Sequence, residues 1–273
     1  MTSSYKLSLD FDPQQLRSDL QLVMAEDWVP HFNTAYFEGE WSGIALRSTE
    51  GAPGNLYPGP INAEPAVDTP VLARCPQIRA ALNSLKCPVR SARLLKLGPG
   101  ARIKEHRDYH LGTDVGEIRL HIPIATDPGV DFFLDNQRIE MKAGECWYLD
   151  FTLPHRVYNG SSIDRVHLVI DCAVDDWLRA QLPHEIFATS GEKDLDQVAE
   201  DGSVSNPEEF ERFRQHVLQN LTLQEKLRQT KDQSSFARLV VGLAADSGYR
   251  FSLTDVHDEL RRERRGWNEI WID

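Results

Sequence analysis

The chain has 273 residues, 41% of them hydrophobic and 26% charged, which is enough for one domain of moderate size with its own core and a small second domain. Its formal net charge of −12 argues against a general nucleic-acid binder, which needs a basic face, and favours small-molecule or neutral-to-basic partners. The sequence has no apolar run of about 18 residues and no signal-peptide pattern, so we expect no membrane segment and a cytoplasmic protein.

The amino-terminal part, to about residue 90, mixes short helical and extended patterns. Asp12-Pro13 precedes leucines at near-helical spacing, which predicts a helix beginning there. The segment from Gly51 to Pro70 is rich in Pro and Gly, so we expect a loop that is long enough to form a lid or rim over a site.

From about residue 90 to 174 the sequence changes to short β-rich runs separated by turn residues, a pattern typical of a sandwich or barrel. The predicted strands fall within residues 92–98, 116–125, 130–135, 138–141, 145–151, 155–159 and 165–172.

The last part of the chain has a helical period. Residues 189–206 are acidic and polar and are predicted to be a linker, and residues 207–273 are predicted to form a small helical domain, which leaves 1–188 for the first domain. Asn206-Pro207 is a plausible helix start, one helix should end near Gly248, and Ser252 or Thr254 should cap another. The apolar stripe of the first helical segment consists of Phe210, Phe213, Val217, Leu221 and Leu227.

The stretch "KEHRDYH", residues 104–110, places His106, Asp108 and His110 at every second position. A non-haem iron site of the oxygenase type needs two imidazoles and one carboxylate with open positions beside them. On a strand, residues i and i+2 point to the same side, so His106 and Asp108 can bind one ion together. The candidate third ligand is His155, which lies 49 residues after His106, whereas His110 is expected in a loop outside the metal site.

Arg165 lies ten residues after His155 and opens an apolar run, where alternation directs it to the same side as His167. A planar, permanently charged guanidinium suits a carboxylate. Taken separately these signals are weak, because an HxD pair occurs by chance and a lone histidine is usually structural, but the whole arrangement is far more specific. The default interpretation of Arg93 is a solvated charge, and Asp171 is expected to cap or solvate a strand end.

The segments "LLKLGPGARIKEHRDYH", "GEIRLHIPI", "AGECWYLDFTLPHRVYNGSS" and "RVHLVIDC" resemble the aspartyl/asparaginyl β-hydroxylase family, which includes bacterial proline hydroxylases, over roughly residues 90–174. The resemblance implies a mainly β fold: a double-stranded β-helix (jelly-roll, cupin-like) core with flanking helices, here followed by an all-helical appendage. It also implies Fe(II), 2-oxoglutarate as cosubstrate, and O2. Animal protein hydroxylases of the family lack the Asp of the HxD pair and bacterial amino-acid hydroxylases keep it, so Asp108 favours the bacterial branch.

The resemblance further implies roles for individual side chains. Arg165 would hold the distal carboxylate of 2-oxoglutarate, and Arg119 and His121 would face the cosubstrate or substrate carboxylates. The alternative for Arg119 and His121 is a buried polar pair. The implied iron ligands are His106, Asp108 and His155.

The tail, over about residues 207–262, resembles a small nitrogen-fixation-associated helical domain that also serves as the leader region of some peptide natural-product precursors. It could be a docking surface, a dimerisation element or a brace, or it could simply pack on the barrel as part of the fold. The basic run at 261–266 is either a solvated helix face or a docking site for an acidic partner.

These features predict an Fe(II)- and 2-oxoglutarate-dependent dioxygenase that hydroxylates an unactivated C–H bond of an amino acid, free or as an Asp-, Asn- or Pro-type residue in a peptide, and releases succinate and CO2. One alternative is a cupin-type metal protein with other chemistry, which would have no need of Arg165. Another is a non-catalytic metal-binding module whose helical tail docks a partner.

Overall fold

The computed structural model describes residues 2–23, 25–31, 36–56, 66–108, 111–113, 116–188, 206–228 and 233–256. The chain divides into two compact units: the described residues up to 188 belong to the first and those from 206 onward to the second. Apart from Asn206, the predicted linker lies outside the described residues, as do His110, the middle of the predicted lid and the basic run at 261–266. The exact domain bounds therefore stay a prediction.

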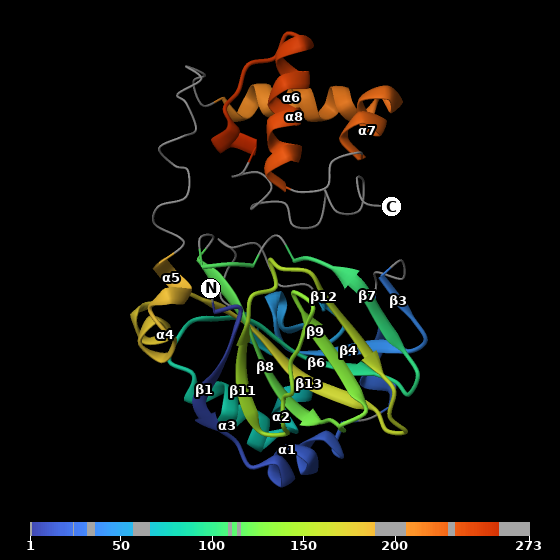
Figure 1. The fold of residues 1–273 in the computed structure, drawn as a ribbon, viewed down its shortest axis with the longest axis vertical. Coiled ribbons are helices and arrows are strands. Elements are labelled where there is room, and N and C mark those ends of the chain that lie inside the picture. Colours follow the sequence, from blue (N-terminus) through green and yellow to red (C-terminus); the bar gives the residue numbers. More distant parts are fainter. Residues whose placement is uncertain are drawn as a thin grey trace. The chain divides into compact units, whose positions relative to one another are not determined.

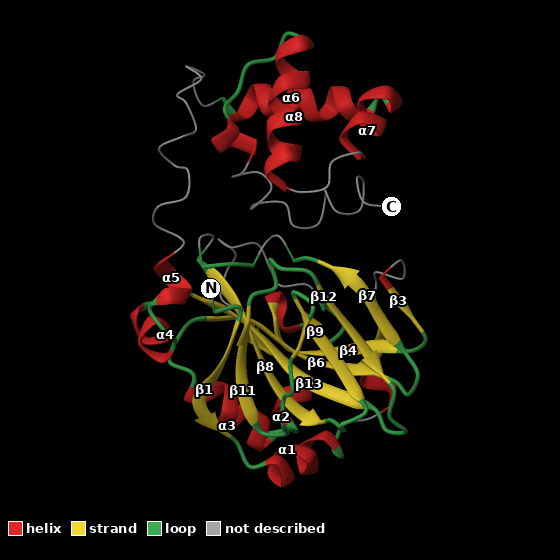
Figure 2. Cartoon of the chain, viewed as in Figure 1, coloured by secondary structure: helices red, strands yellow, loops and turns green. Residues whose placement is uncertain are grey.

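The first unit is built from antiparallel strands with short helices (Figure 2). Its strands are β1 (Ser4–Asp10), β2 (Val29–Pro30), β3 (Phe37–Glu38), β4 (Trp41–Ser48), β5 (Val67–Asp68), β6 (Val89–Leu97), β7 (Arg102–His106), β8 (Glu117–Ala125), β9 (Val130–Leu134), β10 (Gln137–Arg138), β11 (Glu145–Leu149), β12 (His155–Asn159) and β13 (Arg165–Ala173). Its helices are α1 (Pro13–Leu20), η1 (Ala25–Asp27), η3 (Thr49–Gly51), α2 (Pro70–Ala73), α3 (Pro76–Ser84), α4 (Asp176–Gln181) and α5 (Glu185–Ala188).

The described strands form two sheets (Figure 1). The major sheet has the order β1-β11-β8-β13-β6-β4-β2, with β5 paired to β4, and the minor sheet has the order β10-β9-β12-β7-β3. From β6 to β13 the chain alternates between the two sheets, except at the β9–β10 hairpin, which stays in the minor sheet. This connectivity is that of a double-stranded β-helix, so the predicted fold class is confirmed.

The outer face of the major sheet carries the main apolar core. Along β13, Val166, Leu168 and Ile170 point to this face and pack with residues of the helices, because successive side chains alternate across a sheet. The predicted amino-terminal helix is confirmed as α1, whose first N–H groups are capped by Asp12 through bonds to the amides of Gln14 (2.8 Å) and Gln15 (3.3 Å).

The inner face of the same sheet is polar near one end and apolar near the other. A smaller core lies between the sheets and includes Trp41 and Leu97 of the major sheet with Ile103 and Val157 of the minor sheet. The odd-numbered residues of β8 and β13 face this interior, and several of them are charged or histidine. The fold therefore places a polar site inside the barrel.

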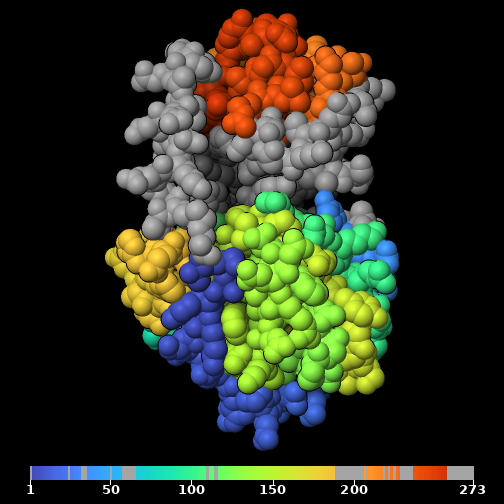
Figure 3. Space-filling view, in the orientation of Figure 1, coloured from blue at the N-terminus to red at the C-terminus, as the bar shows by residue number. Residues whose placement is uncertain are grey.

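The structure adds strands that the sequence patterns did not assign. β1 pairs with β11 and extends the major sheet at its edge, where the blue amino-terminal atoms lie against the yellow-green ones in Figure 3. β4 pairs with β6 and continues the sheet on the other side. β7 ends at His106, so Asp108 follows the strand and does not belong to it.

The second unit is helical, with α6 (Pro207–Leu218), α7 (Leu221–Arg228) and α8 (Gln233–Asp246). The Asn206 side chain caps α6 by accepting from the amide of Glu209 (3.2 Å), and after α8 Gly248 takes a positive φ of 87°, as predicted. Ser252 accepts from the amide of Asp255 (3.1 Å) and caps the next turn. None of the described helices is both long and apolar enough to span a membrane. The unit has its own core, formed by Phe210, Phe213, Val217, Leu223, Leu227, Ala237, Val240, Leu243, Ala244, Phe251 and Val256.

Replacing Gly144 by Ala should destabilise the first unit more than replacing Gly100 by Ala. Both glycines have positive φ, 87° and 74°, so each substitution carries a backbone cost of about 1–2 kcal/mol. A Cβ on Gly144 would lie 2.1 Å from the carbonyl oxygen of Phe11, whereas no described atom lies within 4 Å of a Cβ on Gly100. Thermal unfolding followed by circular dichroism should therefore show the larger fall in Tm for Gly144→Ala, and equal falls would contradict this close approach.

Candidate metal centre

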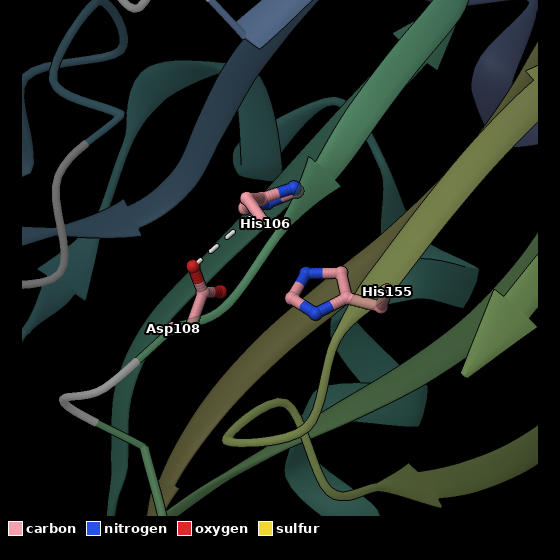
Figure 4. Close-up of side chains that lie close together, drawn as sticks. All are labelled: His106, Asp108 and His155. Carbon is pink, nitrogen blue, oxygen red and sulfur yellow. Dashed lines mark ion pairs between the residues drawn. The ribbon is translucent and has the colours of Figure 1, made fainter. Parts of the chain in front are cut away.

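The three residues expected to bind a metal converge between β7 and β12. His106 ends β7 and pairs directly with His155, the first residue of β12. Asp108 is brought alongside because its amide N–H donates to the carbonyl of Phe151 (2.8 Å). One ligand atom from each of His106, Asp108 and His155 lies within 4.8 Å of the others, and the side chains point toward one another in Figure 4.

Both imidazoles are oriented by the same local hydrogen bond. The Nδ1 atom of His106 lies 2.9 Å from the carbonyl oxygen of Lys104, and that of His155 lies 3.0 Å from the carbonyl oxygen of Leu153. A carbonyl only accepts, so each Nδ1 carries the proton and each Nε2 keeps its lone pair free for a metal. The ring centroids are 4.1 Å apart. Two imidazoles and one carboxylate arranged in this way suit non-haem Fe(II).

The protonation states also suit metal binding. Burial favours the neutral form of Asp108, but the charge of Arg119, with smaller contributions from His155 and His106, outweighs it and lowers the pKa of Asp108 to about 2. Burial lowers the pKa of His155 to about 4, although Asp108 opposes this shift. At neutral pH Asp108 is therefore ionised and His155 is neutral, as metal ligands must be.

Asp108 is bonded to an ion-pair network in the barrel interior. Arg119 donates from Nη1 to Oδ2 of Asp108 and from Nε to Oδ1 of Asp171 (2.6 Å). Asp171 also accepts from Arg93 Nη2 (2.6 Å) and from the Ser91 hydroxyl (3.0 Å). The expectations for Asp171 as a solvated strand end and for Arg93 as a solvated charge were therefore wrong: both are buried, because both point to the inner face of the major sheet.

Arg165 lies buried on the same inner face, and no described residue forms an ion pair with it. Its Nη2 is 3.0 Å from Nδ1 of His167, its Cζ is 6.0 Å from the ring centre of Phe132, and its Nε has no hydrogen-bond partner among the described residues. Burial lowers the pKa of Arg165 to about 9, and no carboxylate offsets it. Since burying an unpaired charge costs several kcal/mol, an anionic ligand beside this guanidinium would offset that cost.

His121 lies beside His167, the residue that contacts Arg165. Its Nδ1 is 3.3 Å from Nδ1 of His167, and its Nε2 is buried without a hydrogen-bond partner in the described part of the chain. Because His167 already accepts from Arg165, His121 must donate from Nδ1, which leaves its Nε2 as an acceptor. The expected contacts of Arg119 and His121 with ligand carboxylates stay predictions, and the structure shows Arg119 bonded to Asp108 and Asp171.

Two residues of the site, Phe151 and His31, were not predicted from the sequence. The ring of Phe151 packs against His155 (4.7 Å between centroids), against His121 (5.0 Å) and under Arg119 (5.6 Å). His31 stacks on Trp41 at 3.4 Å, and burial followed by the charge of Arg93 lowers the pKa of His31 to about 3. Neither residue belongs to a recognisable spacing, so only the tertiary structure places them here.

A model of the aspartyl/asparaginyl beta-hydroxylase family matches residues 11–174, which is more than half of the chain. The chain belongs to this family. The family predicted from the sequence is thereby confirmed, and every residue of the site described above lies within the matched region.

The chain is also similar to individual proteins. The chain is 30% identical over 176 residues to an L-proline cis-4-hydroxylase of Rhizobium meliloti strain 1021, covering 63% of this chain and 61% of the relative. It is 24% identical over 174 residues to L-proline cis-3-hydroxylase 1 of a Streptomyces species, covering 61% of this chain and 59% of the relative. The chain thus spans about three fifths of the length of these relatives. A crystal structure of a 2OG-Fe(II) oxygenase family oxidoreductase from Burkholderia pseudomallei superposes with a TM-score of 0.42 and 14% identity, covering 63% of this chain and 85% of that one.

Replacing either metal-facing histidine should abolish metal binding. His106→Ala and His155→Ala each remove one of three ligands, so we expect Co(II) or Fe(II) affinity to fall by more than about 100-fold, beyond the loss usual for residues that only support a ligand. Anaerobic titration calorimetry measures this change. His184→Ala, which removes an exposed histidine outside the cluster, should bind as the wild type does. Wild-type affinity in both ligand variants would rule out the site.

Proposed function

We propose that the protein is an Fe(II)- and 2-oxoglutarate-dependent hydroxylase of an amino acid. The observation that carries the proposal is the buried, acid-free guanidinium of Arg165 inside the same barrel as the His106, Asp108 and His155 cluster. A metal site alone fits many β-barrel proteins. A buried cation that lacks its own counter-ion, in a chain of this family, supports a dicarboxylate cosubstrate.

The metal and 2-oxoglutarate would together supply the chemistry, in which O2 is consumed, the cosubstrate becomes succinate and CO2, and a C–H bond becomes C–OH. The chain's own residues have binding and orienting roles. The two histidines and Asp108 hold the metal, and Arg165 pairs with the distal carboxylate. The rings of Phe132 and Phe151 lie 6.3 Å apart between centroids, with Arg165 next to Phe132 and His155 next to Phe151, so they supply apolar surface near both polar groups.

An amino-acid substrate is supported by the relatives, whose names give L-proline as the compound that they hydroxylate. The substrate of this chain is proposed to be an amino acid, either free or as a residue in a peptide. Asp108, which keeps the HxD pair complete, agrees with the bacterial amino-acid hydroxylases. The cytoplasmic location and a docking role for the helical unit stay predictions.

The proposal is tested by turnover. Purified protein with Fe(II), 2-oxoglutarate and a panel of free amino acids and short peptides should form succinate together with a product heavier by one oxygen atom, measured by mass spectrometry. His106→Ala should form neither. Equal succinate from the wild type and from His106→Ala would refute the assignment.

Replacing Arg165 by Met should weaken 2-oxoglutarate binding without weakening metal binding. Loss of one partner of a buried charge pair costs about 2–5 kcal/mol, so affinity for 2-oxoglutarate should fall at least about 30-fold. Calorimetric titration of the metal-loaded protein gives this affinity, and the same titration with the metal alone should show binding no weaker than that of the wild type. Unchanged 2-oxoglutarate affinity in Arg165→Met would contradict the assigned role of Arg165.

A further inference from the structure

Asp171 is the most fully satisfied charged group of the barrel interior. It is 0% exposed and lies directly opposite Arg119 in the β13–β8 register and opposite Ser91 in the β13–β6 register. One of its oxygens accepts from Arg119 Nε (2.6 Å), and the other accepts from Arg119 Nη2 (3.2 Å), Arg93 Nη2 (2.6 Å) and the Ser91 hydroxyl (3.0 Å). Bonds from three side chains on two neighbouring strands leave this carboxylate no freedom to rotate.

The position of Asp171 determines where Arg119 can reach. A guanidinium is planar and rigid, so fixing two of its nitrogens fixes the third. With Nε and Nη2 on Asp171, Nη1 of Arg119 meets Oδ2 of Asp108. The other oxygen of Asp108, Oδ1, is left on the side of His106, 3.9 Å from its Nε2.

We propose that Asp171 is a positioning residue for the metal centre: by holding two nitrogens of Arg119, it limits Arg119 to one oxygen of Asp108 and keeps Oδ1 available to the metal. The inference rests on the proposed function in so far as it requires a metal at His106, Asp108 and His155. It adds a residue outside the ligand set, which is linked to Asp108 by two successive hydrogen-bonded contacts through Arg119.

Loss of the Asp171 charge would act through Arg119. A released guanidinium prefers to grip a carboxylate with two parallel bonds, and Asp108 is then the carboxylate within its reach. Such a grip occupies Oδ1 as well as Oδ2 and competes with the metal. The charges of Arg119 and Arg93 also lose the carboxylate that compensates them, and they repel a divalent cation.

The test is a double-mutant cycle on Co(II) affinity in the full-length chain. Asp171→Asn should weaken Co(II) binding by about 10–100-fold, the usual loss for a residue that orients a metal ligand. In an Arg119→Met background the same Asp171→Asn change should cause a loss at least about threefold smaller, because the side chain through which Asp171 acts is gone and only the uncompensated charge of Arg93 remains.

Three results would decide against the proposal in distinguishable ways. Wild-type affinity in Asp171→Asn, with normal binding by the wild type, refutes the positioning role and leaves the metal centre intact. An equal loss in both backgrounds shows that Asp171 does not act through Arg119, which also refutes the positioning role. Absence of Co(II) binding by the wild type refutes the proposed metal centre and the positioning role with it.

If Asp171→Asn fails to fold, the variant Arg119→Met tests the same proposal. Arg119→Met leaves Asp171 bonded to Arg93 and Ser91 but frees Oδ2 of Asp108, so the Co(II) absorption spectrum of this variant should differ from that of the wild type. Arg156→Met is the matched control, since Arg156 adjoins His155 but pairs with Glu105 at the surface, and its spectrum should be unchanged. A wild-type spectrum in Arg119→Met would show that Arg119 does not select the ligand oxygen.

Discussion

Side-chain alternation along β8 and β13 sends charged and histidine side chains inward at most of the odd positions, and each buried charge there needs compensation. Burying a lone charge costs several kcal/mol, more than one apolar side chain returns. Asp171 and Asp108 compensate Arg119, and Asp171 also compensates Arg93. The even positions of the same strands face the helices and form the main apolar core. The alternation of side chains along β8 and β13 therefore produces both the hydrophobic core and the polar interior.

The metal centre depends on a second constraint, the pairing of β7 with β12. That register sets His106 opposite His155, and each ring is fixed by a bond from Nδ1 to the carbonyl two residues earlier in the chain. Because the same Nδ1-to-carbonyl hydrogen bond is formed at two facing positions, both Nε2 atoms are directed toward the candidate metal position. Phe151 links this point to the rest of the interior, because its carbonyl anchors Asp108 while its ring supports His155 and Arg119.

Sequence reasoning succeeded where a pattern is local. Most of the strand runs from 92 to 172 and the helix at Asp12-Pro13 were predictable from period and turn residues, although the run at 138–141 is a strand only at Arg138. The HxD pair with a distant His predicted the cluster of His106, Asp108 and His155, and the role of Arg165 stays a prediction. Strand alternation was nevertheless the wrong reason for placing Asp108, since β7 ends at His106 and a bond to Phe151 positions the aspartate. The burial of Asp171 and Arg93 was not predictable, because a strand's register with its neighbours decides which charges meet.

The charges of the interior also bear on how ligands would bind. Among the described residues of this interior, three carboxyl groups, Asp108, Glu117 and Asp171, accompany three guanidinium groups, Arg93, Arg119 and Arg165. Burial lowers the pKa of Arg93 to about 10 although the nearby carboxylates oppose this shift, whereas the same carboxylates raise the pKa of Arg119 against the effect of burial. With histidines neutral as ligands, these groups balance without any metal. A divalent cation alone would leave the interior positive, and a dicarboxylate alone would leave it negative. A low-dielectric interior penalises a net charge of either sign, so the divalent cation and the dicarboxylate are expected to favour each other's binding. Arg165 would hold the distal carboxylate of the dicarboxylate away from the metal.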